Sequence, residues 1–238
     1  SEPNGRPAPN APRSGGEFVP IGTFTRERYR AALGDGSPEE LCRRIEPWLS
    51  SWARVLRLFL ETPRDQAVAL RDVELLLDEE HFRRLALCAR QAHNRDDAAI
   101  IRAYVALLVD LTNLRTSLRF LGRHLPRERV RSLYLGGGSL NEETFAAMLA
   151  ADGVEQIYHQ LPRGPLTAVL DRGMLSFANT GRASVFERPG DEQVLRLVHR
   201  LARRCPVSVA APLDYLAKAR KEWIKLKMIA CGVRYAVP

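Results

Sequence analysis

The most apolar stretch of the sequence carries a cluster of a carboxylate, an amide and two guanidinium groups: Asp110, Asn113, Arg115 and Arg119. At helical spacing, Asp110 and Asn113 share one face of a helix, and the two arginines share another. A carboxylate, an amide and two guanidinium groups could bind a ligand or do catalysis, but such sites usually draw on several elements. Buried charges must also be paired. We therefore expect a structural cluster that satisfies helix ends and bridges neighbouring helices.

Other signals of chemistry are absent from the sequence. No glycine-rich phosphate loop is predicted, because Gly136–Gly138 is not followed by Gly-Lys-Ser/Thr or preceded by a strand. No nucleophile elbow is found. The four cysteines are far apart and are typical of buried thiols, and the five histidines lack metal-site spacing. The sequence predicts no catalytic, cofactor-binding or metal-binding residues, so we do not expect an enzyme.

Positive charge is concentrated at the carboxyl end of the chain. Residues 196–238 contain ten Lys and Arg and two acids, Asp214 and Glu222, so this segment carries +8. The whole chain also carries +8, and the remaining residues therefore sum to zero. This segment favours an anionic partner such as lipid head groups, nucleic acid or an acidic protein surface.

The last predicted helix, from about 212 to 231, has two faces. An apolar stripe runs along it, made of Leu216, Ala219, Trp223, Leu226 and Ala230. Lys218, Lys221 and Lys225 lie roughly opposite this stripe. One interpretation is a core helix with a solvated outer face. The other is that the three lysines are an interface that docks onto an anionic protein or lipid surface.

Helical periodicity prevails from about residue 37 onward, and no segment alternates as a strand does. Ser37, Pro38 and Glu40 predict a helix start, Pro47 should kink or split that helix, and a second capping box is expected at Ser139 and Glu142. Residues 97–121 are apolar nearly all round, which is typical of a central helix. Residues 1–20 are rich in Pro, Gly and Ser and predict a disordered tail. We therefore expect an all-α protein.

A weak internal repeat appears at an offset of 112 residues. The segment VDLTNLR at 109–115 aligns with KEWIKLK at 221–227. The alignment pairs each residue of the first copy with its counterpart in the second: Asp110 with Glu222, Leu114 with Leu226, and Arg115 with Lys227.

The stretch around the first copy resembles a known family. YVALLVDLTNLRTSLRF, followed by LYLGGGSL, is similar to the middle repeat of the C subunit (the d subunit in eukaryotic naming) of V/A-type rotary ATPases. The terminal PLDYLAKARKEWIKLKMIACGVRY is similar to the third repeat, although Lys221, Ile224 and Lys225 depart from its pattern. The resemblance spans roughly residues 67–238. It implies a funnel of pseudo-symmetric helical units: a partial or divergent first unit at 21–66, a second at 67–138 and a third at 139–238.

The resemblance also implies a function. It indicates a non-catalytic central-stalk subunit that connects the shaft of the soluble head to the membrane rotor ring and transmits torque for proton or sodium transport. Such a subunit would be cytoplasmic and peripheral to the membrane; the sequence has no apolar run long enough to span a bilayer. Because the chain starts at Ser, we expect a fragment or a processed chain. Two other hypotheses stay open: a basic helical nucleic-acid-binding protein and a helical enzyme with an unrecognised site.

Overall fold

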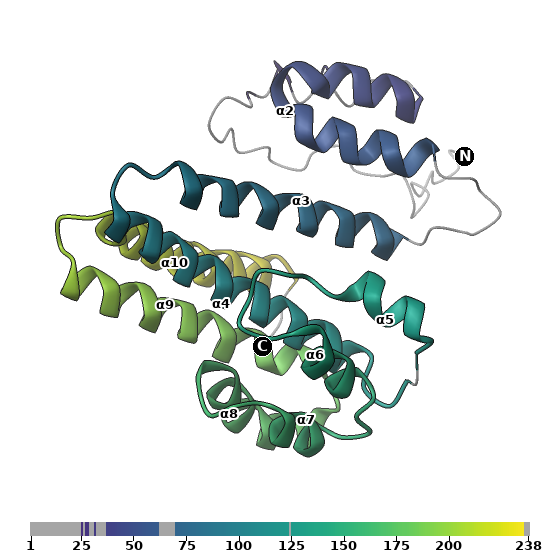
Figure 1. Cartoon of the computed structure of the whole chain (residues 1–238), viewed down its shortest axis with the longest axis vertical. Coiled ribbons are helices and arrows are strands. Elements are labelled where there is room, and N and C mark those ends of the chain that lie inside the picture. The colour runs from purple at the N-terminus through teal and green to yellow at the C-terminus, as the bar shows by residue number, and fades with distance from the viewer. Residues whose placement is uncertain are drawn as a thin grey trace, which may run out of the picture. The chain divides into compact units, whose positions relative to one another are not determined.

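The computed structural model describes residues 25, 27, 28, 31, 37–61, 70–123 and 125–235. Every regular element within these ranges is a helix, so the all-α prediction is confirmed (Figure 1). The predicted disordered tail lies outside the described residues. The helices are α2 (Pro38–Glu61), α3 (Leu70–Gln91), α4 (Arg95–Arg119), α5 (Arg127–Leu133), α6 (Glu142–Leu149), α7 (Val154–Gln160), α8 (Pro165–Thr180), the 3-10 turn η1 (Ala183–Phe186), α9 (Glu187–Arg204) and α10 (Ala210–Tyr235).

The chain forms two compact units that divide between Leu77 and Asp78, within α3. In the first unit, α2 begins after Ser37, whose hydroxyl accepts the Glu40 N–H at 3.3 Å as the predicted cap requires. The helix is interrupted at Leu49 (φ −134°, ψ 49°), close to Pro47. This break agrees with the expected kink, since proline cannot continue the hydrogen-bond ladder. The predicted units at 21–66, 67–138 and 139–238 stay a prediction.

The core of the second unit is built around α4. Leucines 107, 111, 114 and 118 of α4 pack against buried residues of the segment from Leu140 to Phe186. Val105 and Val109, also on α4, make a separate cluster with Leu135 and contact Phe82 of α3. α4 contacts α6, α8, η1 and α9, and Figure 1 shows it lying alongside α9. Burial on most sides explains why its sequence is apolar nearly all round.

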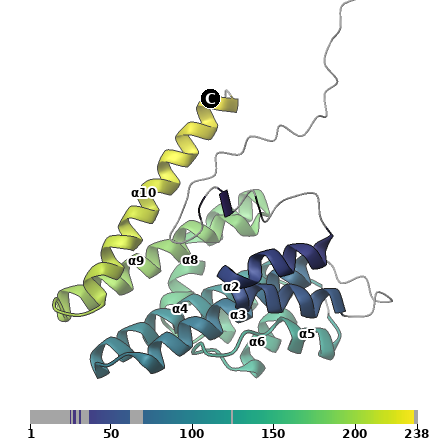
Figure 2. The same cartoon turned by 90° about the horizontal axis from the view of Figure 1, so that it is seen from above.

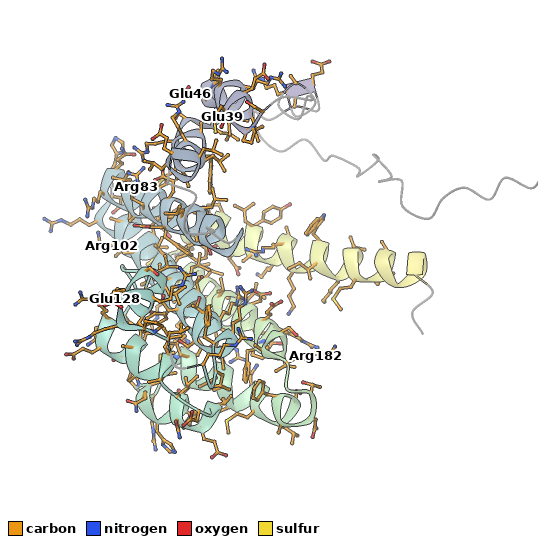
Figure 3. The ribbon with its side chains drawn as sticks, turned by 90° about the vertical axis from the view of Figure 1, so that its right-hand side faces the viewer. Glu39, Glu46, Arg83, Arg102, Glu128 and Arg182 are labelled. Atoms are coloured by element: carbon orange, nitrogen blue, oxygen red, sulfur yellow. The ribbon has the colours of Figure 1, made fainter. Side chains whose placement is uncertain are left out.

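The two carboxyl-terminal helices form a hairpin. α10 packs on α9, and α9 in turn packs on α4 and α8. The start of α10 is tied to the first turn of α4, because the Asp97 carboxylate accepts the Val209 N–H at 2.8 Å. Beyond this point α10 extends away from the other helices of its unit (Figures 2 and 3).

Candidate functional site

Asp110 lies in the middle of α4 and is only 4% exposed. Its carboxylate accepts three hydrogen bonds from the loop before α6: from the Ser139 N–H at 3.0 Å, the Ser139 hydroxyl at 2.5 Å and the Leu140 N–H at 3.1 Å. An ionised carboxylate that receives several such donors is stabilised despite its burial. Ser139 therefore bonds to a side chain of α4. The predicted capping box at Ser139 is wrong, since α6 begins at Glu142 and Asn141 caps it by accepting the Thr144 N–H.

Asn113, one turn further along α4, holds the same segment at an earlier point. Its side-chain amide donates to the Leu135 carbonyl at 2.8 Å, and its amide oxygen accepts the Leu135 N–H at 3.1 Å. Asn113 is fully buried, so these two bonds satisfy groups that water cannot reach. Asp110 and Asn113 together hold residues 135–140 against α4; we call this arrangement the α4 clamp.

The α4 clamp depends on a glycine. A Cβ atom placed on Gly138 would lie 2.0 Å from Oδ1 of Asp110 and 3.2 Å from a Val109 methyl group. No side chain fits at that distance, so the approach of the loop to the carboxylate requires glycine. Tyr134 borders the clamp and donates its hydroxyl to the Leu140 carbonyl at 2.7 Å. Burial, together with the nearby charges of Asp110 and Glu142, raises the pKa of Tyr134.

The other α4 residues that the sequence analysis singled out have separate roles. Leu114 is a core residue, 1% exposed. Arg115 reaches Asp191 on α9 at 3.5 Å, and both side chains are over one-third exposed, so the ion pair adds little stability. Arg119 is exposed. The structure thus joins Asp110 and Asn113 in one arrangement and separates them from the arginines.

The proposed second copy of the motif has different surroundings. Asp110 is buried, whereas Glu222 on α10 is exposed and Leu226 is 65% exposed. The side chain of Lys227 lies outside the described residues. The pairing of these residues with Asp110, Leu114 and Arg115 stays a prediction, and their environments give it no support.

Lys218 belongs to a polar cluster at the base of the hairpin. Its ammonium group donates to Oδ2 of Asp214 at 2.6 Å, and Nδ1 of His199 lies 3.4 Å from the same oxygen. The other oxygen of Asp214 is buried and has no hydrogen-bond partner within the described residues. Burial alone would raise the pKa of Asp214, but the hydrogen bonds and charges of Lys218 and His199 lower it overall. Lys218 therefore makes an internal contact, which its i,i+4 spacing from Asp214 could have indicated.

Lys221 and Lys225 instead line a groove of about 620 Å³. One wall is α4 with the adjacent part of α3, the other wall is α10, and α9 with Ser184 of η1 completes it. We call this the α4–α10 groove. The apolar stripe predicted to be the core side of the last helix is largely exposed: Leu216 is 60% exposed, Trp223 57% and Leu226 65%. The interpretation of α10 as a core helix is therefore wrong, although Lys221 and Lys225 are exposed as that interpretation expected.

Two negative findings concern the described part of the chain. None of its helices combines the length and apolarity needed to cross a membrane. No three or more His, Cys, Asp and Glu side chains in it gather where they could hold a metal ion.

Fold and site together define an all-helical protein whose buried polar residues hold its own segments together. The model of the ATP synthase (C/AC39) subunit family matches residues 10–238, and the chain belongs to this family. This confirms the resemblance to the C subunit of V/A-type ATPases.

Individual relatives agree with the family. The C subunit of the A-type ATP synthase of Pyrococcus abyssi is 30% identical over 165 residues, which cover 68% of this chain and 44% of that protein. The same protein of Thermococcus kodakarensis is 31% identical, over 62% of this chain and 39% of that protein. The C subunit of the V-type ATP synthase of Thermus thermophilus is 24% identical, over 91% and 61%. The chain thus matches less than half the length of these two archaeal relatives.

Proposed function

We propose that the chain is a non-catalytic coupling subunit, or part of one, in a V/A-type rotary ATPase. The observation that carries the proposal is the family match over residues 10–238, together with relatives named as the C subunits of A-type and V-type ATP synthases. In this role it connects the shaft of the soluble head to the membrane rotor ring and passes torque between them during proton or sodium transport. It is peripheral to the membrane on the cytoplasmic side, and the wider family funnel supplies its two interfaces.

The α4 clamp supports a mechanical role. A part that transmits torque must resist deformation, and a close-packed interior has low compressibility. The clamp adds directional constraints to that packing, because two buried side chains of one helix take part in all five of its hydrogen bonds. Both carboxylate oxygens of Asp110 and both terminal amide atoms of Asn113 already bond to the loop.

Affinity purification from the native cell tests the proposal. A tagged copy of the chain, expressed at its normal level, is expected to bring down head-shaft and rotor-ring subunits of a rotary ATPase in constant proportion. The matched control is a tagged Asp110→Ala variant, whose disturbed core should reduce this recovery. Recovery of the wild-type chain without any rotary ATPase subunit would count against the proposal.

The alternative of a nucleic-acid-binding protein is favoured only by the +8 charge of residues 196–238. Binding of this kind falls steeply with salt. Recovery of nucleic acid at low salt, in place of ATPase subunits, would favour it.

A further inference from the structure

The α4–α10 groove has an apolar interior. Tyr104, Leu108 and Leu111 of α4 line it on one side, and Ile224 and Met228 of α10 line it on the other. Burial raises the pKa of Tyr104, while the nearby charge of Arg220 lowers it in part, so Arg220 lies close to the opposite wall. A concave surface of this composition is typical of a site that binds another apolar surface.

The size of the groove fits a helix. Its α10 wall runs from Ala217 to Met228 and its α4 wall from Tyr104 to Arg115. At 1.5 Å per residue, each wall is about 16 Å long, or about three helical turns. A helix could lie between α4 and α10, because the two walls diverge from the point where Asp97 holds Val209 (Figure 2). Figure 3 shows the far part of α10 standing clear of its unit.

The charges of the groove select the partner. All charged residues that line it from α10 are cations: Arg220, Lys221 and Lys225. No ion pair is found for them among the described residues. On the facing side three acids line the groove: Glu187, Asp191 and Glu192. Asp191 pairs with Arg115, and Glu192 contacts Arg172, Arg188 and Arg196. The α10 wall therefore complements acidic side chains.

A membrane surface and a second copy of α10 fit the groove less well than an acidic helix does. A membrane is flat and would contact the outside of α10, whereas Lys221 and Lys225 line a concavity on its inner side. A second copy of α10 would bring the same cationic wall against itself, and like charges across an interface are costly.

We propose that the α4–α10 groove binds an amphipathic α-helix of a partner protein, with an apolar stripe of about three turns flanked by acidic side chains. The apolar stripe packs between Leu108 and Ile224, and the carboxylates pair with Arg220, Lys221 and Lys225. This inference adds a binding site to the proposed function. It rests on the proposed function only in assuming that the partner helix belongs to the rotary ATPase complex. The binding chemistry itself can be tested on the isolated full chain.

The probe is a fluorescein-labelled helical peptide of about 15 residues, with leucines along one face and glutamates on both flanks. A second peptide carries lysine at each glutamate position. Fluorescence anisotropy is expected to show saturable binding of the acidic peptide and at least tenfold weaker binding of the basic one. Equal binding of the two peptides, or binding of neither, would overturn the proposal.

Variants locate the binding. Lys221→Glu/Lys225→Glu should weaken binding of the acidic peptide by roughly tenfold or more and strengthen that of the basic peptide. The matched control is Arg203→Glu/Arg204→Glu, which makes the same charge change at exposed positions on α9 outside the groove and should change binding little. Circular dichroism confirms that each variant folds. Equal effects of the two double variants would mean that only net charge matters, and would reject the groove.

Two more arms separate the alternatives. Leu216→Ser/Leu226→Ser on the outer stripe should leave peptide binding unchanged, whereas Ile224→Ser in the groove should reduce it; the reverse pattern would overturn the assignment. If phosphatidylserine vesicles bind the chain without displacing the peptide, the proposal stands. If Lys221→Glu/Lys225→Glu loses vesicle binding but keeps peptide binding, the lysines form a lipid-binding surface and the proposal is rejected. If the chain binds the acidic peptide but no ATPase subunits co-purify with it, the proposed function is rejected and the groove proposal stands.

Discussion

The carboxylate of Asp110 accepts the backbone N–H of Leu140 at 3.1 Å, across thirty residues of sequence. Two more hydrogen bonds from Ser139 converge on the same carboxylate. An interior position on a helix thus holds a loop that has no regular structure of its own. The first predictions follow from this contact.

Removing the carboxylate should destabilise the protein. Asp110→Ala leaves the buried N–H of Leu140 without its partner and removes the acceptor of both Ser139 bonds, and we expect a loss of about 3 kcal/mol in the free energy of unfolding. Denaturant unfolding followed by circular dichroism measures this. Asp171→Ala, on the exposed side of α8, is the control and should lie within about 0.5 kcal/mol of the wild type. An unchanged midpoint for Asp110→Ala would contradict the structural role.

Adding a methyl group at Gly138 should also be costly. Its Cβ would lie 2.0 Å from Oδ1 of Asp110, so the loop or the carboxylate must move. We expect Gly138→Ala to lose about 2 kcal/mol of stability, as overpacked sites do. Gly136→Ala is a close control, because its Cβ would meet nothing within 4 Å. Similar melting temperatures for the two variants would show that the loop can yield.

A second glycine tests the packing of α8 on η1. A Cβ on Gly173 would lie 2.2 Å from the ring of Phe186, which is 1% exposed. Gly173→Ala should therefore destabilise the protein by about 2 kcal/mol. Shortening the facing ring with Phe186→Leu should offset part of this loss in the double variant, and a double-mutant cycle measures the coupling. Additive losses would argue against direct contact.

Stability should depend on pH through Asp214. Hydrogen bonds from Lys218 and His199 overcome the effect of burial and lower the pKa of Asp214 below its ordinary value of 3.8. A carboxyl whose pKa is depressed by folding adds stability above its unfolded pKa and loses it as the pH falls through the folded value. Asp214→Asn should therefore be destabilising at pH 7, and its difference from the wild type should shrink below about pH 3.8. A difference independent of pH would contradict the assignment.

The three lysines of α10 should respond differently to charge reversal. Lys218→Glu places a carboxylate beside Asp214 and should lower stability by about 1 kcal/mol, whereas Lys221→Glu and Lys225→Glu should leave it nearly unchanged. All three reversals together should weaken assembly of the rotary complex. Thermal melts and co-purification separate the two effects. Full assembly after triple reversal would remove these lysines from the interface.

Much of the fold could be predicted from local pattern. The helical class, the start of α2 and the central place of α4 follow from periodicity, capping residues and an apolar circumference. Ser139 shows the limit: its sequence context predicts a helix cap, yet α6 begins at Glu142 and is capped by Asn141. A cap is a local preference, and here Ser139 bonds to Asp110 instead.

The site was less predictable because its partners are distant in sequence. Nothing in the residues around Asp110 indicates Ser139 or Gly138, although the Gly136–Gly138 run signals a close backbone approach in retrospect. The two faces of α10 are present as the pattern predicts, but the apolar stripe is largely exposed, as the lysines are, and is not buried as in a core helix. An amphipathic pattern tells which residues lie together on a helix, and only tertiary packing decides which face is covered.

The three loop residues held by the α4 clamp have one more consequence. Leu135, Ser139 and Leu140 lie outside any helix, yet their N–H groups bond to side chains seated in the core. Deuterium can replace those hydrogens only when the loop parts from α4, so their exchange rates should match those of the core helix and not those of a surface turn. These amides are natural reporters of how often the centre of the molecule opens.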